Sequence, residues 1–204
     1  MLQLRDAGRR FGTRRVFSGL DLDVPAGMRL LVAGGNGSGK TTLLRCLSGT
    51  LKLTAGDGTV CGRRVGSLAA KRLVGVCLAT DHGLYDTLSA HDNLMLVARL
   101  RLSSRQVASA VSQVERELGI DGFADMPVQQ CSAGMRARVT IGRALLGEPA
   151  VLLLDEPSHA LDEQARGLLW AALDRRPEVT CVVASHHEDD RTRCHRTLAL
   201  PVHR

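Results

Sequence analysis

A glycine-rich segment in the first quarter of the chain carries a lysine followed by a threonine. It fits the pattern Gly-x-x-x-x-Gly-Lys-[Ser/Thr], in which glycines leave the backbone free to turn successive N–H groups inward around a phosphate. We expect Lys40 to contact the β and γ phosphates of a nucleotide and the Thr41 hydroxyl to bind Mg²⁺. The expected phosphate-binding residues are Gly34, Gly35, Asn36, Gly37, Ser38, Gly39, Lys40, Thr41 and Thr42.

An apolar run late in the chain ends in two carboxylates, Asp155 and Glu156. Because the carboxyl end of a buried strand opens into the ligand crevice of an α/β sheet, Asp155 is expected to hold Mg²⁺ through water. Glu156 is then expected to polarise an attacking water as general base. Two acids after a strand, taken alone, are more often a solvated turn or the start of a helix. The glycine-rich loop in the same chain favours the catalytic interpretation.

The spacing of apolar residues indicates which elements position these groups. Residues 29–33 predict a short strand before the glycine-rich loop and residues 41–48 a helix after it, the order that a phosphate-binding unit requires. Ser89 and Ser104 are the expected N-caps of two helices in the middle third, with Asp92 completing a capping box. Further strands are expected at 2–4, 16–24, 73–79, 151–154, 179–184 and 197–200, and further helices at 90–102, 105–118, 136–145 and 163–173.

The composition is that of one globular domain. Of the 204 residues, 44% are hydrophobic and 24% charged, and no apolar run approaches the ~20 residues of a membrane-spanning helix. The N-terminus lacks the pattern of a secretory signal, so we expect a cytosolic protein. The six cysteines form no Cys-x-x-Cys pair, which disfavours structural zinc and a disulfide framework. The net charge of +6 comes from dispersed arginines with few aromatic residues, so nucleic acid is not an expected partner.

Residues 131–135 read Cys-Ser-Ala-Gly-Met and precede a helix-forming segment, and with them the chain resembles the ATP-binding subunits of ABC transporters. The glycine-rich loop looks like Walker A, residues 152–156 look like Walker B, residues 131–135 are similar to the signature sequence, and residues 160–162 are similar to the D-loop. The passage at residues 83–94 resembles the same region of ATPases that serve ABC-2-type exporters, and the short chain is similar to the haem-exporter ATPase.

The resemblance implies an α/β fold with a P-loop NTPase core. In that core a RecA-like parallel sheet is combined with an antiparallel β subdomain and a helical signature subdomain. The implied organisation is a single domain over residues 1–204, with residues 1–78 and 146–204 as the catalytic core and about 79–145 as the helical subdomain.

The resemblance also implies roles for single residues. Phe11 occupies the place of the aromatic side chain that stacks on adenine, and His186 that of the histidine that contacts the γ-phosphate near Glu156. Ser132 and Gly134 would bind the γ-phosphate of an ATP held by a second subunit, so that two copies of the chain enclose two ATP molecules with Mg²⁺. We expect His187 to be a surface residue, and no metal-ligand spacing is evident among His82, His91, His159, His195 and His203.

Two motifs depart from the family pattern. The signature is usually Leu-Ser-Gly-Gly-Gln, whereas Cys131, Ala133 and Met135 stand in three of its positions here. The glutamine expected after the strand at 73–79 is absent, and Thr80 is the nearest equivalent for a contact with Mg²⁺. These departures bear on the rate of hydrolysis and on coupling to a membrane partner rather than on nucleotide binding.

The favoured interpretation is an ATPase that drives an ABC exporter through separate transmembrane permease subunits. It would be cytoplasmic and peripheral on the inner face of the cell membrane, with Tyr85, Arg99 and Arg101 as candidate contacts to the permease. Two alternatives stay open: an ABC-type ATPase acting on nucleic acid or ribosomes, and a nucleotide-gated structural subunit that hardly hydrolyses ATP. The transported molecule would touch only the membrane subunits, so no residue of this chain identifies it.

Overall fold

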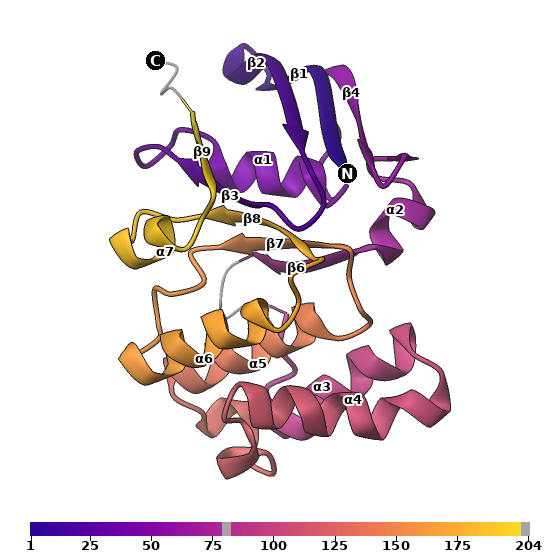
Figure 1. Cartoon of the computed structure of the whole chain (residues 1–204), viewed down its shortest axis with the longest axis vertical. Coiled ribbons are helices and arrows are strands. Elements are labelled where there is room, and N and C mark those ends of the chain that lie inside the picture. Colours follow the sequence, from indigo (N-terminus) through magenta and orange to yellow (C-terminus); the bar gives the residue numbers. More distant parts are fainter. Residues whose placement is uncertain (79–82, 201–204) are drawn as a thin grey trace.

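The computed structural model describes residues 1–78 and 83–200, which form two β-sheets and seven α-helices within those ranges (Figure 1). Two short 3₁₀ helices lie at Asp121–Phe123 and Val128–Gln130. The strands are β1 (Leu2–Phe11), β2 (Arg14–Val24), β3 (Arg29–Ala33), β4 (Ala55–Val60), β5 (Arg63–Arg64), β6 (Val74–Leu78), β7 (Val151–Asp155), β8 (Thr180–Ala184) and β9 (Arg196–Ala199). The α-helices are α1 (Lys40–Leu47), α2 (Leu68–Arg72), α3 (Ala90–Arg101), α4 (Ser104–Glu117), α5 (Ala133–Leu145), α6 (Glu163–Asp174) and α7 (Glu188–Thr192).

Five strands form a parallel sheet in the order β6-β7-β8-β3-β9. Every residue of β7 and β8 is buried, because other elements cover both faces of the sheet. A strand buried on both faces needs an uninterrupted apolar run rather than alternation, and the sequence of β7 supplies one. The register pairs Val32 with Ala184 and Ala184 with Asp155, so β3, β8 and β7 end at the same level.

The other sheet is antiparallel, in the order β2-β1-β4-β5. The strand predicted at residues 2–4 is present but extends to Phe11. The prediction stopped too early because Asp6 stands where the alternation of Leu2 and Leu4 requires an apolar residue, whereas in the structure β2 also pairs with residues 7–11 of β1 and satisfies their backbone. Register shifts between Leu4 and Arg10 bend β1, and Phe11 is the last residue of the bent strand.

Two hydrophobic cores lie on opposite faces of the parallel sheet. One fills the space between α1, the antiparallel sheet and the parallel sheet, as the position of α1 in Figure 1 illustrates. The other joins the opposite face of the sheet to α5 and α6, with α3 and α4 packed outside them. Leu94 of α3 and Leu152 of β7 belong to this same core. The division into a catalytic core and a helical subdomain at about residues 79–145 stays a prediction.

The N-cap residues of the helices show how well a short sequence pattern predicts where a helix begins. Ser89 caps α3 as predicted, since its Oγ accepts from the Asp92 N–H at 2.9 Å and donates to the Asp92 carboxylate at 2.8 Å. The prediction that Ser104 caps the next helix is wrong, because Ser103 is the N-cap of α4 and Ser104 is its first residue. Gln106, three residues after Ser103, accepts from the Ser103 N–H and so decides between the two adjacent serines.

The short elements β5, α2 and α7 were not predicted, since two to five residues are too few to establish a period. Within residues 1–78 and 83–200, no helix has both the length and the apolar character needed to cross a membrane.

Candidate active site

Three chain segments that carry the predicted chemistry leave the parallel sheet at one edge. The glycine-rich loop follows β3, Asp155 and Glu156 stand at the end of β7, and His186 comes two residues after β8. Because β8 lies between β3 and β7 and the three strands end level, these segments meet in the crevice at the carboxyl ends of the strands. The sheet thus gathers residues that lie more than 100 positions apart in the sequence.

The glycine-rich loop wraps around the start of α1. Lys40 is buried, and its Nζ donates to the carbonyl oxygens of Gly34 at 2.7 Å and Gly35 at 3.4 Å. Gly39 has φ of +98°, and a Cβ there would lie 2.4 Å from Cγ1 of Val16, so only glycine fits without displacement. The buried Ser38 Oγ has no hydrogen-bond partner. A helix N-terminus, an ammonium group and an unsatisfied hydroxyl in one loop suit a phosphate group.

The loop forms one wall of a pocket of about 520 Å³. Phe11 also lines this pocket with 48% of its surface exposed, and the Arg9 guanidinium lies 4.3 Å from the centre of the Phe11 ring. The pocket therefore combines an aromatic ring and basic side chains with the carboxylates of Asp155 and Glu156. The lining residues are Phe11, Arg14, Arg15, Val16, Asn36, Gly37, Ser38, Gly39, Lys40, Thr41, Thr42, Asp155, Glu156 and His159.

Asp155 is almost fully buried at the end of β7. Burial raises the pKa of its carboxyl group, while a hydrogen bond with the Thr41 side chain acts in the opposite direction. The two predicted Mg²⁺ ligands, a hydroxyl and a carboxylate, are thus in contact with each other. Hard oxygen donors of this kind fit Mg²⁺, which is held by few protein ligands and several waters. Thr80, the third predicted ligand, lies outside the described residues.

Glu156 and His186 are paired across the crevice. Nδ1 of His186 lies 2.8 Å from Oε2 of Glu156, and the His186 N–H donates to the same oxygen at 3.4 Å. The Glu156 backbone has φ of +48°, a conformation uncommon outside glycine, and its N–H donates to the Ala184 carbonyl at 2.7 Å. That bond anchors the Glu156 backbone to the neighbouring strand. Glu156 is only partly buried, so water can reach its carboxylate.

Ser132 and Gly134 are not brought to the pocket that the glycine-rich loop lines. Ser132 is exposed and caps α5, its Oγ accepting from the Met135 N–H at 3.2 Å. Gly134 lies beside the predicted D-loop, where a Cβ would come within 3.0 Å of the Ala160 carbonyl oxygen. The signature residues therefore form a second polar surface on the same chain, separate from the pocket.

Sequence reasoning missed several residues near the site. Arg14 and Arg15 line the pocket because the turn after β1 folds back beside Phe11. The Ser158 hydroxyl donates to the fully buried Asp190 at 2.5 Å, tying the segment after β7 to α7. His159 lines the pocket and lies close to His186. The sequence signal for His159 was its place three residues after Glu156, just beyond the acidic end of the predicted buried strand.

Comparisons with known proteins place the chain in a family. The ABC transporter family model matches residues 17–159, and the chain belongs to the ABC transporter family. It is 38% identical over 176 residues to the Nod factor export ATP-binding protein I of Cupriavidus metallidurans, covering 85% of this chain and 58% of that protein. The protein of the same name from Burkholderia thailandensis is 33% identical over 205 residues, covering 98% of this chain and 67% of that one. The chain thus spans a little over half to two thirds of the length of these relatives.

A dimeric ATP-binding cassette solved in a post-hydrolysis state with ADP and Pi has the same fold. It superposes with a TM-score of 0.89, covering 99% of this chain and 95% of that one at 22% sequence identity. The predicted fold class, a P-loop NTPase with a parallel sheet, an antiparallel sheet and helices, is confirmed.

Proposed function

We propose that this chain is the ATP-binding subunit of an ABC exporter and that it hydrolyses ATP to ADP and phosphate. The observation that carries the proposal is the meeting of three groups at one crevice: Lys40 in its glycine loop, the buried Asp155, and Glu156 paired with His186. Phosphate binding, divalent-cation binding and activation of water each have a matching group there. Family membership and relatives named for export support the same function.

ATP binding is assigned to the pocket that Phe11 and the glycine-rich loop line. Adenine stacks on the exposed face of Phe11, whose other face is covered by the Arg9 guanidinium. The triphosphate lies along the loop, where Lys40 exchanges its bonds to the Gly34 and Gly35 carbonyls for phosphate oxygens. Thr41 and, through water, Asp155 would hold Mg²⁺, which would supply positive charge to the β and γ phosphates.

Hydrolysis is assigned to Glu156. Its carboxylate accepts a proton from a water molecule whose oxygen forms a bond to the γ-phosphorus. The bond between that phosphorus and the oxygen bridging to the β-phosphate breaks, and ADP leaves. His186 holds the Glu156 carboxylate through its Nδ1 and backbone N–H, so it positions the base. Because the pair is only partly buried, neither group needs a large movement to meet a water molecule.

A second copy of the chain completes the site in this proposal. Ser132 and the N-terminus of α5 are exposed and do not line the pocket of their own chain, yet they suit an anion. Two chains related by twofold symmetry would each present this surface to the ATP of the other. A separate transmembrane subunit would receive the motion and hold the dimer at the inner face of the membrane, as relatives named for export suggest.

The decisive test uses the scarcity of lysine in this chain. Lys40→Ala removes the only lysine in the pocket, whereas Lys52→Ala removes an exposed lysine and leaves the pocket intact. We expect Mg²⁺-dependent ATP binding, measured by calorimetry, to be lost in Lys40→Ala and kept in Lys52→Ala. Unchanged ATP affinity in Lys40→Ala would contradict the proposal. If the wild type binds ATP without turnover, even together with its permease, the alternative of a weakly hydrolysing structural subunit would replace the proposed ATPase function.

A further inference from the structure

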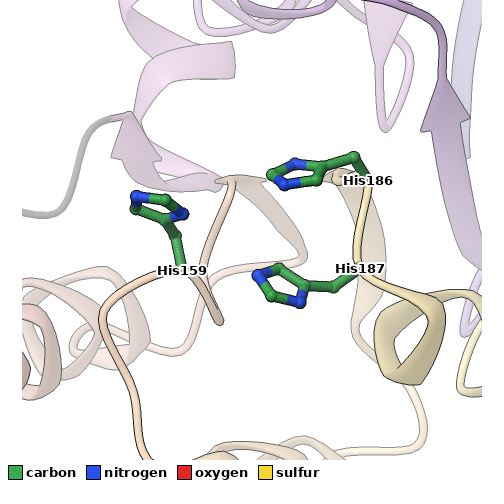
Figure 2. Close-up of side chains that lie close together, drawn as sticks. All are labelled: His159, His186 and His187. Atoms are coloured by element: carbon green, nitrogen blue, oxygen red, sulfur yellow. The ribbon is translucent and has the colours of Figure 1, made fainter.

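Three histidines form a cluster beside the candidate active site. His159 follows β7, and His186 and His187 follow β8, so the neighbouring strands deliver them to one place (Figure 2). Each contributes one ring nitrogen, and these three atoms lie within 4.8 Å of one another. Among residues 1–78 and 83–200, this is the one group of at least three His, Cys, Asp or Glu side chains close enough to share a metal ion.

The rings are close enough to be drawn together by side-chain rotation. Their centres lie 6.3 Å apart for His159 and His186, 6.4 Å for His159 and His187, and 4.9 Å for His186 and His187. In a tetrahedral zinc site the ligand nitrogens are ~3.4 Å apart, so each pair must approach by at most ~1.4 Å. His159 and His186 are exposed and His187 is half-buried, which leaves room for that rotation.

The backbones that carry the histidines are anchored, which limits the entropy lost when an ion binds. The His159 N–H donates to the Glu156 carbonyl at 3.1 Å, closing a turn after β7. The His187 N–H donates to the Ser185 hydroxyl at 3.0 Å. Both anchors lie directly after strands whose residues are all buried. The backbone that carries the cluster is therefore held by hydrogen bonds, and only the side chains need to rotate when an ion binds.

His186 has the kind of hydrogen-bond partner that is usual for a metal-bound imidazole, a carboxylate. When Nδ1 of His186 donates its proton to Oε2 of Glu156 at 2.8 Å, Nε2 keeps its lone pair. A carboxylate behind a histidine fixes the ring, sets the tautomer and makes the free nitrogen a stronger ligand. Glu156 can thus support a metal-bound His186 as its hydrogen-bond partner from the position that it already occupies.

We propose that His159, His186 and His187 bind a transition-metal ion, Zn²⁺ being the ion best suited to three neutral imidazoles, with water as the fourth ligand. The site is separate from the oxygen-ligand Mg²⁺ position at Thr41 and Asp155. Ion binding occupies His186 and holds Glu156 in its outer shell, so the ion inhibits ATP hydrolysis; this consequence rests on the proposed function. Binding itself does not.

The binding test uses tag-free protein without nucleotide, titrated with ZnCl₂ by calorimetry. The wild type is expected to bind one Zn²⁺ per chain, and His159→Ala and His187→Ala are each expected to weaken binding by ~10-fold or more. Glu156→Gln should weaken it by ~10–100-fold through loss of the outer carboxylate. His195→Ala is the matched control, because His195 is exposed and outside the cluster, and it should bind like the wild type. Equal affinity in all variants would overturn the site, because the zinc would then be bound elsewhere on the chain.

The inhibition test compares wild type with His187→Ala, a residue outside the hydrolysis machinery. Without zinc the two should turn over ATP at the same rate. Added zinc should slow the wild type and leave His187→Ala active, and chelation of ATP by zinc is the same in both. Equal inhibition of both proteins would overturn the regulatory consequence. Absence of turnover in zinc-free wild type would refute the proposed function instead, and the binding titration would still decide the metal site.

Discussion

Gly39 is the residue at which the loop geometry makes the sharpest quantitative prediction. Its φ of +98° is costly for any residue with a Cβ, by ~1–2 kcal/mol. The added methyl group in Gly39→Ala would also lie 2.4 Å from Cγ1 of Val16, and relieving such an overlap costs ~1–3 kcal/mol. We expect the free energy of unfolding to fall by roughly 2–5 kcal/mol, or the loop to shift and ATP affinity to fall.

Gly62 is the matched control for this substitution. It has φ of +73° in the turn between β4 and β5, and a Cβ there meets nothing within 4 Å. Gly62→Ala should therefore cost only the backbone term of ~1–2 kcal/mol. Urea unfolding of both variants without nucleotide measures the difference, which isolates the overlap with Val16. ATP affinity should fall in Gly39→Ala and stay unchanged in Gly62→Ala.

A double variant separates overlap from general damage to the loop. Val16→Ala removes the carbon atom that Gly39→Ala would strike, so the double variant should lose less stability than the two single losses added together. Equal losses in Gly39→Ala and Gly62→Ala, or strictly additive losses in the double variant, would refute this account of why the loop requires glycine.

Two further predictions concern the carboxylates. Glu156→Gln keeps an oxygen for the His186 hydrogen bond but removes the base, so ATPase activity should fall by ~10²–10⁴-fold. ATP binding should stay intact, and the ATP-bound dimer should persist longer. Turnover within a few fold of the wild type, or an equal fall in the exposed control Glu163→Gln, would speak against Glu156 as base. Burial raises the pKa of Asp155, so the folded state binds its proton more readily than the unfolded state, and stability falls as the pH rises through the raised pKa. Asp155→Asn should therefore raise Tm at neutral pH in Mg²⁺-free, nucleotide-free buffer, and this gain in Tm should shrink as the pH is lowered. The same variant should weaken Mg²⁺-dependent ATP binding. A Tm difference that does not change with pH would exclude burial of the carboxylate as the cause.

The phosphate-binding loop and the acidic strand end could be predicted because each depends on neighbours in the chain. Glycines next to Lys40 set local backbone angles, and an unbroken apolar run before Asp155 implies a strand buried on both faces. Residue type and spacing carry this information directly. The same local logic found the N-cap at Ser89 but placed the next N-cap at Ser104, one residue too late, because it overlooked Gln106, which completes a capping box with Ser103.

The sheet order decided what those local motifs could do together. Placing β8 beside β7 brings Glu156 to His186 and sets His159 beside His187. Strand order follows from which faces pack against which helices over the whole chain, and no short stretch of sequence contains it. Residue type and spacing were therefore enough to predict the phosphate loop, the two acids and the family resemblance. Which of the dispersed side chains share a site follows from the fold of the whole chain.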